Sequence, residues 1–246
     1  MKALIFAAGL GTRLKPFTEK HPKALVEVNN RPMLERTIRR LMSYGINDIV
    51  INVHHFADQI LRFLEENNNF GANIQISDET ALLLDTGCGV AKAAEMLKDT
   101  EPVLVCNTDI LTDMNISGMI EAHTVSGADV TLLAQERTTS RYLYFNPGTK
   151  LLSGWANIKT GETKPEHFTP TPQLLQRAFG GYHILSQKAL SLISQMPSSM
   201  PFGIIPWYVE NITNLSIYGY TPKEEYQWFD IGSPETLKKA ENNFIE

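Results

Sequence analysis

The sequence predicts an α/β protein with a Rossmann-like mixed, mostly parallel sheet covered by helices on both faces. Two observations support this prediction. In the first 135 residues, short apolar runs of strand length alternate with longer segments whose apolar residues recur at helical spacing. Such alternation favours crossover connections between parallel strands. Several of these apolar runs end in glycine or in a polar residue, and in open α/β sheets ligands bind beyond the carboxyl ends of the strands.

The first half of the chain supplies the regular alternation. Pro32 fits a first helical turn, and the apolar stripe from Met33 to Met42 predicts an amphipathic helix that ends at Gly45. The other elements follow from apolar runs and the residues that interrupt them. We expect strands at 3–8, 46–53, 74–76, 103–106 and 130–134, and further helices at 56–64, 90–97 and 116–124.

The pattern changes after residue 135. Short alternating pieces from Arg141 to Lys164, broken at 146–148 and 160–162, predict hairpins. The proline-rich segment 165–172 is expected to form a loop over the site rather than a linker. The remaining expected elements are strands at 179–185, 216–220 and 227–231, a helix at 204–212, and a closing helix that Ser233 caps and Pro234 begins.

Composition limits the classes of function. The 246 residues are 43% hydrophobic and 20% charged, which fits one large globular domain. A net charge of -5 disfavours nucleic acid or an anionic membrane as the main partner. No apolar run approaches the ~20 residues of a membrane span, and no cleavage site follows the first run, so we expect a cytoplasmic protein. Cys88 and Cys106 lack disulfide or zinc spacing and are interpreted as reduced packing residues.

The stretch after the first apolar run is the strongest candidate for a ligand site. Gly9 and Gly11 let the backbone approach a ligand, and a glycine turn after a strand suits a di- or triphosphate. Leu14 occupies the place of a small residue in the dinucleotide fingerprint, and the Gly-Lys-Ser/Thr of the P-loop is absent. The alternative is an ordinary connection with solvated charges. Against the single acid Glu19, the basic residues here are Arg13, Lys15, Lys20 and Lys23.

A longer series of motifs resembles the sugar-1-phosphate nucleotidylyltransferase family. It begins with Ala7-Ala8-Gly9-Leu10-Gly11-Thr12-Arg13, Pro16, Pro22-Lys23-Ala24-Leu25 and Val28-x-x-x-Pro32-Met33. It resumes at Asp85-Thr86-Gly87-Cys88-Gly89, Asn107-Thr108-Asp109 and Asp230-Ile231-Gly232. The resemblance implies the nucleotide-diphospho-sugar transferase type of fold in a single domain, 1–246. Its nucleotide-binding half would be 1–135 and its sugar-phosphate-binding half 136–246.

The resemblance also implies an activity. A nucleotidyl group would pass from a nucleoside triphosphate to a sugar 1-phosphate, with Mg²⁺ as cofactor and pyrophosphate as the second product. Because the attacking phosphate oxygen is already anionic, the protein mainly aligns two anions and neutralises the departing pyrophosphate. Two alternatives stay open: cytidylyl transfer to phosphocholine, and a nucleotide-sugar-binding regulatory subunit without turnover. We expect a monomer or homodimer with a single activity, because no residues follow the closing helix.

By this resemblance the nucleotide site comprises the glycine turn and the start of a later helix. Arg13 would bind the leaving β- and γ-phosphates as a planar fork, and Lys23 would bridge toward the α-phosphate as a mobile point charge. Thr86 also fits simple N-capping, and Glu79 also fits a solvated acid. The expected nucleotide-binding residues are Ala7, Ala8, Gly9, Gly11, Thr12, Glu79, Thr86 and Gly87.

The resemblance assigns Mg²⁺ to Asp109 and Asp230, which both lie in or just after an apolar strand. Carboxylates in such places are costly unless they are paired or bound to a metal. Hard oxygen ligands completed by substrate phosphates are what Mg²⁺ prefers. The alternative for Asp230 is a cap for the closing helix.

The sugar-phosphate side is less sharply marked. Gly180 and Gly181 match the family's sugar-pocket strand, where missing side chains leave room for the pyranose. Lys164 is a candidate for the sugar phosphate, although Glu162-Thr163-Lys164-Pro165 is one residue longer than the family's Glu-Lys-Pro. The pair His54-His55 is interpreted as structural or surface residues rather than a metal pair, since adjacent strand residues face opposite ways. The tryptophans are interpreted as packing residues, with Trp207 the one that a loop-rich neighbourhood could bring to the pocket: Trp155, Trp207 and Trp228.

Overall fold

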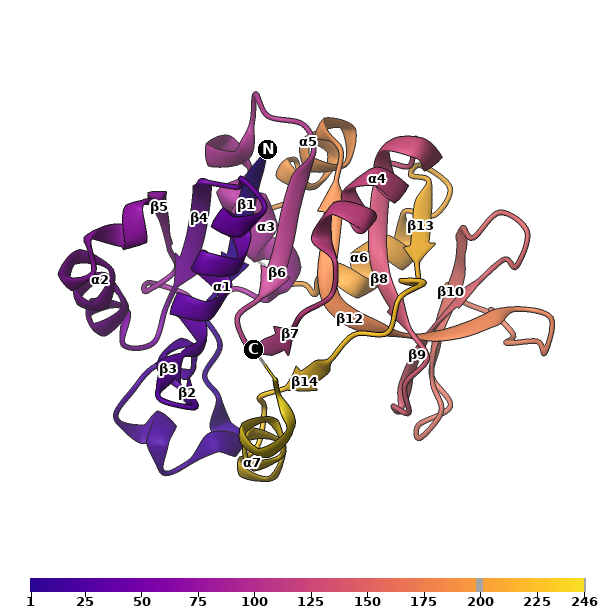
Figure 1. The fold of residues 1–246 in the computed structure, drawn as a ribbon. Coiled ribbons are helices and arrows are strands. Elements are labelled where there is room, and N and C mark those ends of the chain that lie inside the picture. The colour runs from indigo at the N-terminus through magenta and orange to yellow at the C-terminus, as the bar shows by residue number, and fades with distance from the viewer. Residues whose placement is uncertain (198–200, 246) are drawn as a thin grey trace.

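The computed structural model describes residues 1–197 and 201–245, and a mixed ten-stranded sheet forms its centre (Figure 1). Its strands are β1 (Lys2–Phe6), β4 (Asp48–Val53), β5 (Asn73–Asp78), β6 (Val103–Asn107), β8 (Val130–Gln135), β9 (Arg141–Phe145), β10 (Leu152–Asn157), β11 (Thr163–Lys164), β12 (Leu175–Leu185) and β13 (Ile217–Tyr220). Their order is β11-β10-β9-β12-β6-β1-β4-β5, with β8 paired to both β12 and β13.

Parallel strands form the N-terminal side of the sheet. β1 pairs in parallel with β4 and β6, and β4 pairs in parallel with β5. Phe6 at the end of β1 is the partner of Asn107 at the end of β6. The segments that follow these two strands, with Gly9 and Asp109, therefore start from the same edge of the sheet.

Helices cover both faces, which confirms the predicted fold class. Apolar residues of three helices share one buried cluster with Ile5 of β1, and those of three others share a second cluster with Leu4. Successive strand residues point to opposite faces, so the two clusters lie on the two sides of the sheet. The first three helices are α1 (Met33–Ser43), α2 (Ala57–Glu66) and α4 (Ile116–Ser126), and the others are α3 (Thr86–Leu97), α5 (Gln187–Ser194) and α6 (Ile204–Glu210).

The C-terminal side of the sheet is antiparallel except for the parallel pair β8 and β13, and it bends away from the parallel side. β12 pairs with β6 and β8 near its end and with β9 near its start, and its register shifts between Phe179 and His183. Gly181 has a φ of +81° there, and a Cβ at Gly180 would lie 2.5 Å from the Leu133 side chain. These glycines let β12 bend into the meander β9-β10-β11, which confirms the expected hairpins.

The proline-rich segment 165–172 does not lie over the site as expected. The Phe168 ring packs against Tyr144, with 5.6 Å between ring centroids, and against the backbone of Gly154. The side chains of Leu143 and Trp155 point to the opposite face of the meander, where they line a cavity. The loop therefore covers the outer face, because the apolar side chains available to Phe168 are on that side.

Two short strand pairs lie outside the main sheet. They are β2 (Glu27–Val28) with β3 (Arg31–Pro32), and β7 (Ile110–Thr112) with β14 (Trp228–Asp230). The sequence analysis did not predict β2, β3 or β7. The closing helix α7 (Pro234–Asn243) is confirmed, with a capping box between Ser233 and Thr236. No helix in the described part of the chain combines the length and apolarity needed to span a membrane.

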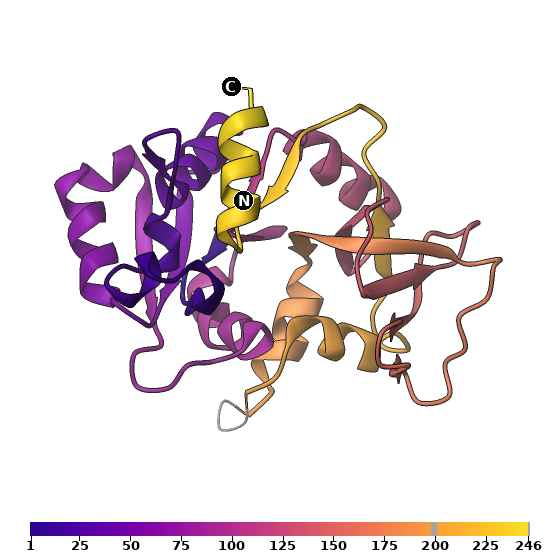
Figure 2. The same ribbon diagram turned by 90° about the horizontal axis from the view of Figure 1, so that it is seen from below.

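Helix α7 holds the loop that follows β1. Leu14 and Val26 of this loop share a buried cluster with Ile231 and with Ala240 of α7. Figure 2 shows the yellow helix beside the indigo loop. The last helix of the chain thus fixes the basic segment that starts near the first strand.

We predict that Gly180→Ala destabilises the fold. The added methyl group would meet Leu133 at 2.5 Å inside the core, and overpacking of this kind costs about 1–3 kcal/mol. Urea unfolding should report the loss. Gly148→Ala is the matched control, since its Cβ would make only an ordinary 3.4 Å contact in an exposed turn. Equal stability of the two variants would show that close packing does not hold the bend.

Candidate active site

Two carboxylates meet where β7 pairs with β14. Asp230 is the register partner of Ile110, and the Ile231 N–H donates a hydrogen bond of 2.7 Å to the carbonyl oxygen of Asp109. Asp109 lies in the turn after β6, so the parallel sheet fixes one acid and the C-terminal strand fixes the other. Residues more than 120 positions apart are thus neighbours at the carboxyl edge of the sheet.

Basic side chains from two different segments surround this pair. The Lys23 ammonium forms an ion pair with the Asp109 carboxylate, and their side chains are only 15% and 25% exposed. A Cβ at Gly232 would lie 2.5 Å from both the Arg13 guanidinium and an Asp230 oxygen, so both groups converge on this glycine. The predicted residues Arg13, Lys23, Asp109 and Asp230 therefore form one cluster.

Asp230 carries the clearest electrostatic signal in the cluster. Burial raises the pKa of its carboxyl group and the Asp109 charge raises it further, while Lys23, Arg13 and Arg137 lower it. Its Oδ1 atom is buried and has no hydrogen-bond partner among the described residues. A buried carboxylate oxygen without a partner is costly, so this position suits a bound cation. Asp230 does not cap α7, because Ser233 does.

Hydrogen bonds from Thr18 and to Asn52 hold the glycine turn beside the cluster. Gly11 adopts a left-handed conformation with a φ of +62°, and its carbonyl oxygen accepts a 2.8 Å hydrogen bond from the Thr18 hydroxyl. The N–H groups of Ala7 and Ala8 donate to the Asn52 side-chain oxygen at 2.7 and 3.3 Å. These two donors are therefore engaged within the protein and do not point at a ligand as free N–H groups.

Glu79 differs from its expected place. Its side chain is 0% exposed, and its Oε1 accepts a 2.8 Å hydrogen bond from Asn52 Nδ2. It is neither a solvated acid nor a residue that reaches a ligand. Burial raises the pKa of Glu79 above its usual value, although Asn52 and the Leu84 backbone oppose this shift. Glu79 supports the site indirectly, by orienting the amide that holds Ala7 and Ala8.

A first cavity of about 500 Å³ opens above this support. The glycine turn, the end of β6 and the start of α3 form its wall, and Asn52 contributes its floor. Gly11 and Thr12 follow on the loop but do not line the cavity. The predicted residues in its wall are Ala7, Ala8, Gly9, Lys23, Thr86 and Asp109.

At the start of α3, backbone N–H groups that the sequence suggested for a ligand are hydrogen-bonded within the protein. Asp85 is the N-cap in place of Thr86, and its carboxylate accepts from the Thr86 N–H at 2.6 Å. The Gly87 N–H donates to the carbonyl oxygen of Phe202 at 2.9 Å, and a Cβ at Gly87 would lie 2.3 Å from the Phe202 ring. Gly87 therefore permits close packing of the segment before α6, and its N–H is not free for a nucleotide.

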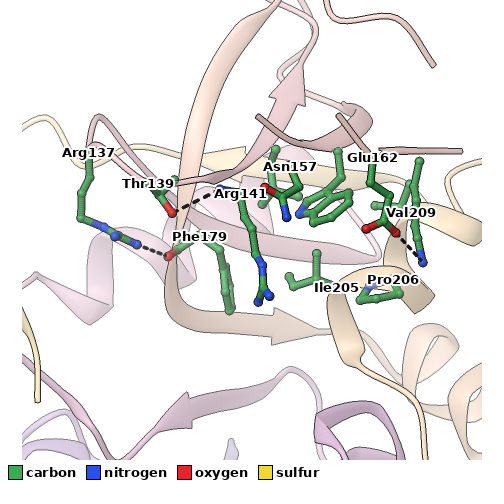
Figure 3. Close-up of a pocket in the computed structure, with 12 residues that line it drawn as sticks. Arg137, Thr139, Arg141, Asn157, Glu162, Phe179, Ile205, Pro206 and Val209 are labelled. Atoms are coloured by element: carbon green, nitrogen blue, oxygen red, sulfur yellow. Dashed lines mark hydrogen bonds and ion pairs between the residues drawn. The ribbon is translucent and has the colours of Figure 1, made fainter. Parts of the chain in front are cut away.

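A second cavity of about 470 Å³ lies between the meander and α6 (Figure 3). Lys164 lines it, and its ammonium lies 3.8 Å from Glu162. Gly180 and Gly181 do not line it. A Cβ at Gly180 would meet the Leu133 side chain at 2.5 Å and a Cβ at Gly181 would meet Ile110 at 2.7 Å, so the protein itself fills the space beside these two glycines. The remaining cavity-lining residues include Trp155, which sequence analysis had interpreted as packing, whereas Trp207 is buried.

Sequence reasoning missed Asn52, Arg137 and Arg141. Asn52 was visible as the one amide in the apolar run 49–53. Arg137 follows β8 in an irregular stretch and Arg141 is the first residue of β9, and no sequence periodicity says which way either side chain points. The histidines at 54 and 55 are structural as expected: His54 Nδ1 lies 2.6 Å from the Glu79 carbonyl oxygen, and His55 stacks on Phe56.

The remaining titratable candidates do not form a separate metal site. Cys88 and Cys106 are buried and form no disulfide, and burial raises the pKa of Cys106 to about 12. This agrees with their interpretation as packing residues. Within the described ranges 1–197 and 201–245, no three His, Cys, Asp or Glu side chains are grouped as ligands for a metal. A cation at Asp109 and Asp230 would need further oxygen atoms from substrates.

Comparison with known proteins places the chain in a family. A family model described as nucleotidyl transferase matches residues 2–246. A mannose-1-phosphate guanyltransferase of Yarrowia lipolytica is 30% identical over 96% of this chain and 61% of its own length. An N-acetylmuramate alpha-1-phosphate uridylyltransferase of Caulobacter vibrioides is 29% identical over 99% of this chain and 97% of its own length. This chain spans about three fifths of the guanyltransferases that it matches.

Solved structures support the fold. HddC from Yersinia pseudotuberculosis, complexed with GMP-PN, superposes with a TM-score of 0.76 at 20% identity, over 99% of both chains. A candidate glucose-1-phosphate thymidylyltransferase from Bacillus anthracis, in complex with a sucrose, has a TM-score of 0.78 at 20% identity and covers 100% of this chain and 98% of its own. The chain belongs to the nucleotidyl transferase family.

We predict that Glu79→Gln changes how stability depends on pH. Because burial raises the folded-state pKa of Glu79, the unfolded chain loses this proton at a lower pH than the folded chain does. The Glu79 contribution to stability is thus largest at acid pH and is lost as the pH rises through the folded-state pKa. Glutamine keeps the oxygen that accepts from Asn52 and cannot ionise.

The stability of Glu79→Gln relative to the natural chain should therefore be higher at pH 8 than at pH 4.5, as measured by urea unfolding. Glu66→Gln, an exposed acid at the end of α2, is the control and should show no such trend. A pH-independent difference for Glu79→Gln would mean that this carboxyl group has no raised pKa in the folded protein.

Proposed function

We propose that this member of the nucleotidyl transferase family transfers a nucleotidyl group from a nucleoside triphosphate to a sugar 1-phosphate and releases pyrophosphate. The observation that carries the proposal is the Asp109–Asp230 pair, with Lys23 and Arg13 beside it, at the edge of the first cavity. Carboxylates and cations interleaved in this way suit a reaction between two polyanions.

The chemistry requires little from the protein besides charge and alignment. An oxygen of the sugar phosphate attacks the α-phosphorus, the new P–O bond forms, and the bond to the β-phosphate oxygen breaks with its electrons leaving on pyrophosphate. Lys23, which lines the first cavity, would place its ammonium on the α-phosphate. Arg13, which lies earlier on the same loop, would hold the departing β- and γ-phosphates with its planar guanidinium.

The acidic residues fit a bound Mg²⁺. Among the described residues Asp230 Oδ1 is buried without a hydrogen-bond partner, and burial and then the Asp109 charge raise the pKa of this carboxyl group. Asp109 and Asp230 would hold the ion through hard oxygen ligands. When bound, Mg²⁺ would neutralise phosphate charge and bring the two substrates together.

The two cavities divide the substrates between them. Small residues and backbone form the wall of the first cavity, which suits the nucleotide, while the charged and aromatic second cavity suits the sugar. Arg137 lies between the second cavity and the carboxylate pair, since it lines this cavity and its charge acts on Asp230. The relatives' names nominate mannose 1-phosphate and N-acetylmuramate 1-phosphate as acceptors, with GTP and UTP as donors.

The positively charged lining argues against phosphocholine as the acceptor. The residues that line the second cavity include three cations and a single acid, Glu162; the cations are Arg137, Arg141 and Lys164. A quaternary ammonium group would be repelled there. A regulatory subunit without turnover is disfavoured because all four charged residues of the cluster are present and lie together.

Incubation with Mg²⁺, each common nucleoside triphosphate and a panel of sugar 1-phosphates should release pyrophosphate for at least one pair. We predict that Arg13→Ala and Lys23→Ala each slow this turnover by about 10²–10³-fold, since each removes a contact to charge that develops in the transition state. Lys15→Ala is the control, because Lys15 lies on the same loop and its exposed ammonium forms an ion pair with the exposed Glu19. Near-normal rates in both test variants would remove this loop from the mechanism.

The metal assignment predicts a separate result. Asp230→Asn should raise the Mg²⁺ concentration needed for half-maximal turnover, because an amide oxygen is a weaker ligand than a carboxylate. It should not lower thermal stability, because it also removes a partly buried charge next to Asp109, on a side chain whose Oδ1 has no hydrogen-bond partner among the described residues. A lower melting temperature with an unchanged Mg²⁺ titration would assign Asp230 a structural role instead.

A further inference from the structure

The second cavity carries more positive charge than one sugar phosphate requires. Three cations line it, Arg137, Arg141 and Lys164, and Glu162 is the one acid in its lining. Lys164 lies 3.8 Å from Glu162, so this lysine is largely compensated within the protein. The two arginines then provide the net charge of the cavity.

Arg137 is held rigidly at the side of the cavity that adjoins the carboxylates. Its guanidinium stacks 4.4 Å above the Trp228 ring and donates a 3.2 Å hydrogen bond to the Phe179 carbonyl oxygen. Its charge acts on Asp230, which places it beside the reaction centre. Arg137 is therefore positioned to meet the phosphate on the anomeric carbon of the sugar.

Arg141 occupies a different position and lacks a partner. It lies at the start of β9, and its side chain extends into the space between Phe179 and Ile205 (Figure 3). Among the residues that the structure describes, its guanidinium makes no hydrogen bond or ion pair. A second arginine, aimed into a cavity whose first arginine already serves the phosphate, has five donors and a full charge to offer.

We propose that the acceptor is a sugar 1-phosphate with a second anionic substituent, which Arg141 binds. This inference rests on the proposed function, because it takes the second cavity to be the acceptor site. Arg141 would be a specificity-determining residue: a neutral sugar leaves its guanidinium unpaired in a partly apolar cavity, whereas a carboxylate or phosphate forms a charge-assisted, bidentate contact. Trp155 and Phe179 provide the apolar surfaces against which the sugar ring packs.

Matched pairs of ligands test the charge alone. N-acetylglucosamine 1-phosphate and N-acetylmuramic acid 1-phosphate differ by one carboxylate-bearing substituent. Glucose 1-phosphate and glucuronic acid 1-phosphate differ at one carbon, which is oxidised to a carboxylate in the second compound. Glucose 1,6-bisphosphate adds a phosphate in place of a carboxylate. Calorimetry in the presence of Mg²⁺ and a non-hydrolysable triphosphate analogue gives the affinity of each, and pyrophosphate release gives turnover.

The natural chain should bind at least one acidic member about 10–100-fold more tightly than its neutral counterpart, which corresponds to one charged hydrogen-bonded contact. In Arg141→Gln this ratio should fall toward one, and Arg141→Lys should keep part of it because the charge remains. Lys159→Gln is the control, since Lys159 is exposed on the neighbouring turn outside the cavity, and the ratio should survive there. The acidic ligand that binds most tightly shows whether Arg141 prefers a carboxylate or a second phosphate.

Equal affinity within every pair, or a ratio that Arg141→Gln leaves unchanged, would overturn the proposal. These results would leave nucleotidyl transfer to a neutral sugar 1-phosphate intact. Conversely, an Arg141-dependent preference for acidic sugars without pyrophosphate release from any triphosphate would support the inference and contradict the proposed function.

Discussion

The repulsion between Asp109 and Asp230 is the constraint on which the rest of the site depends. The backbone pairing of β7 with β14 forces the two carboxylates together, and partial burial makes their charges expensive. Cations from separate parts of the chain partly compensate these negative charges. Lys23 and Arg13 come from the loop after β1, and Arg137 comes from the segment after β8. The first of these segments is held by its packing against α7.

The same constraint explains why the two ends of the chain meet. A loop with many charges and three short 3₁₀ turns has little apolar surface of its own, so it would not keep Arg13 in place. Leu14 and Val26 anchor it to Ile231 and Ala240. The strand that supplies Asp230 and the helix that follows it thus provide both the second carboxylate and the support for the cations that neutralise it.

Sequence patterns predicted those parts of the fold whose signals are local. The apolar stripe of α1 and the capping box of α7 lie within a few residues, and both helices are found close to their expected bounds. β7 was missed because three residues carry too little periodicity, although it is the strand that brings the acids together. Most of the charged cluster followed from a family resemblance, and the structure brings its four residues together without testing their roles.

The errors have a common physical origin. Gly180 and Gly181 were interpreted as places where a missing side chain leaves room, and Gly87 as part of a helix start with free N–H donors, but a sequence does not say what lies beside a glycine. In each case the neighbour is another part of the protein: Leu133, Ile110 or Phe202. Glu79 was misplaced for the same reason, since a carboxylate after a strand can face solvent, a ligand or, as here, a buried amide.

Differences between the two cavities bear on how a shared chemistry serves different substrates. The first cavity, which we propose for the nucleotide, is lined mainly by backbone and small side chains, whose positions depend on the buried Asn52 and on strand pairing. Changes there disturb the fold. The second cavity meets its ligand with side chains from a meander and a short helix, of which Arg141 and Lys164 extend from strands at the far edge of the sheet. Substitution at these positions alters the charge of the cavity without touching the core, so acceptor specificity can change there while the carboxylates and the cations around them stay in place.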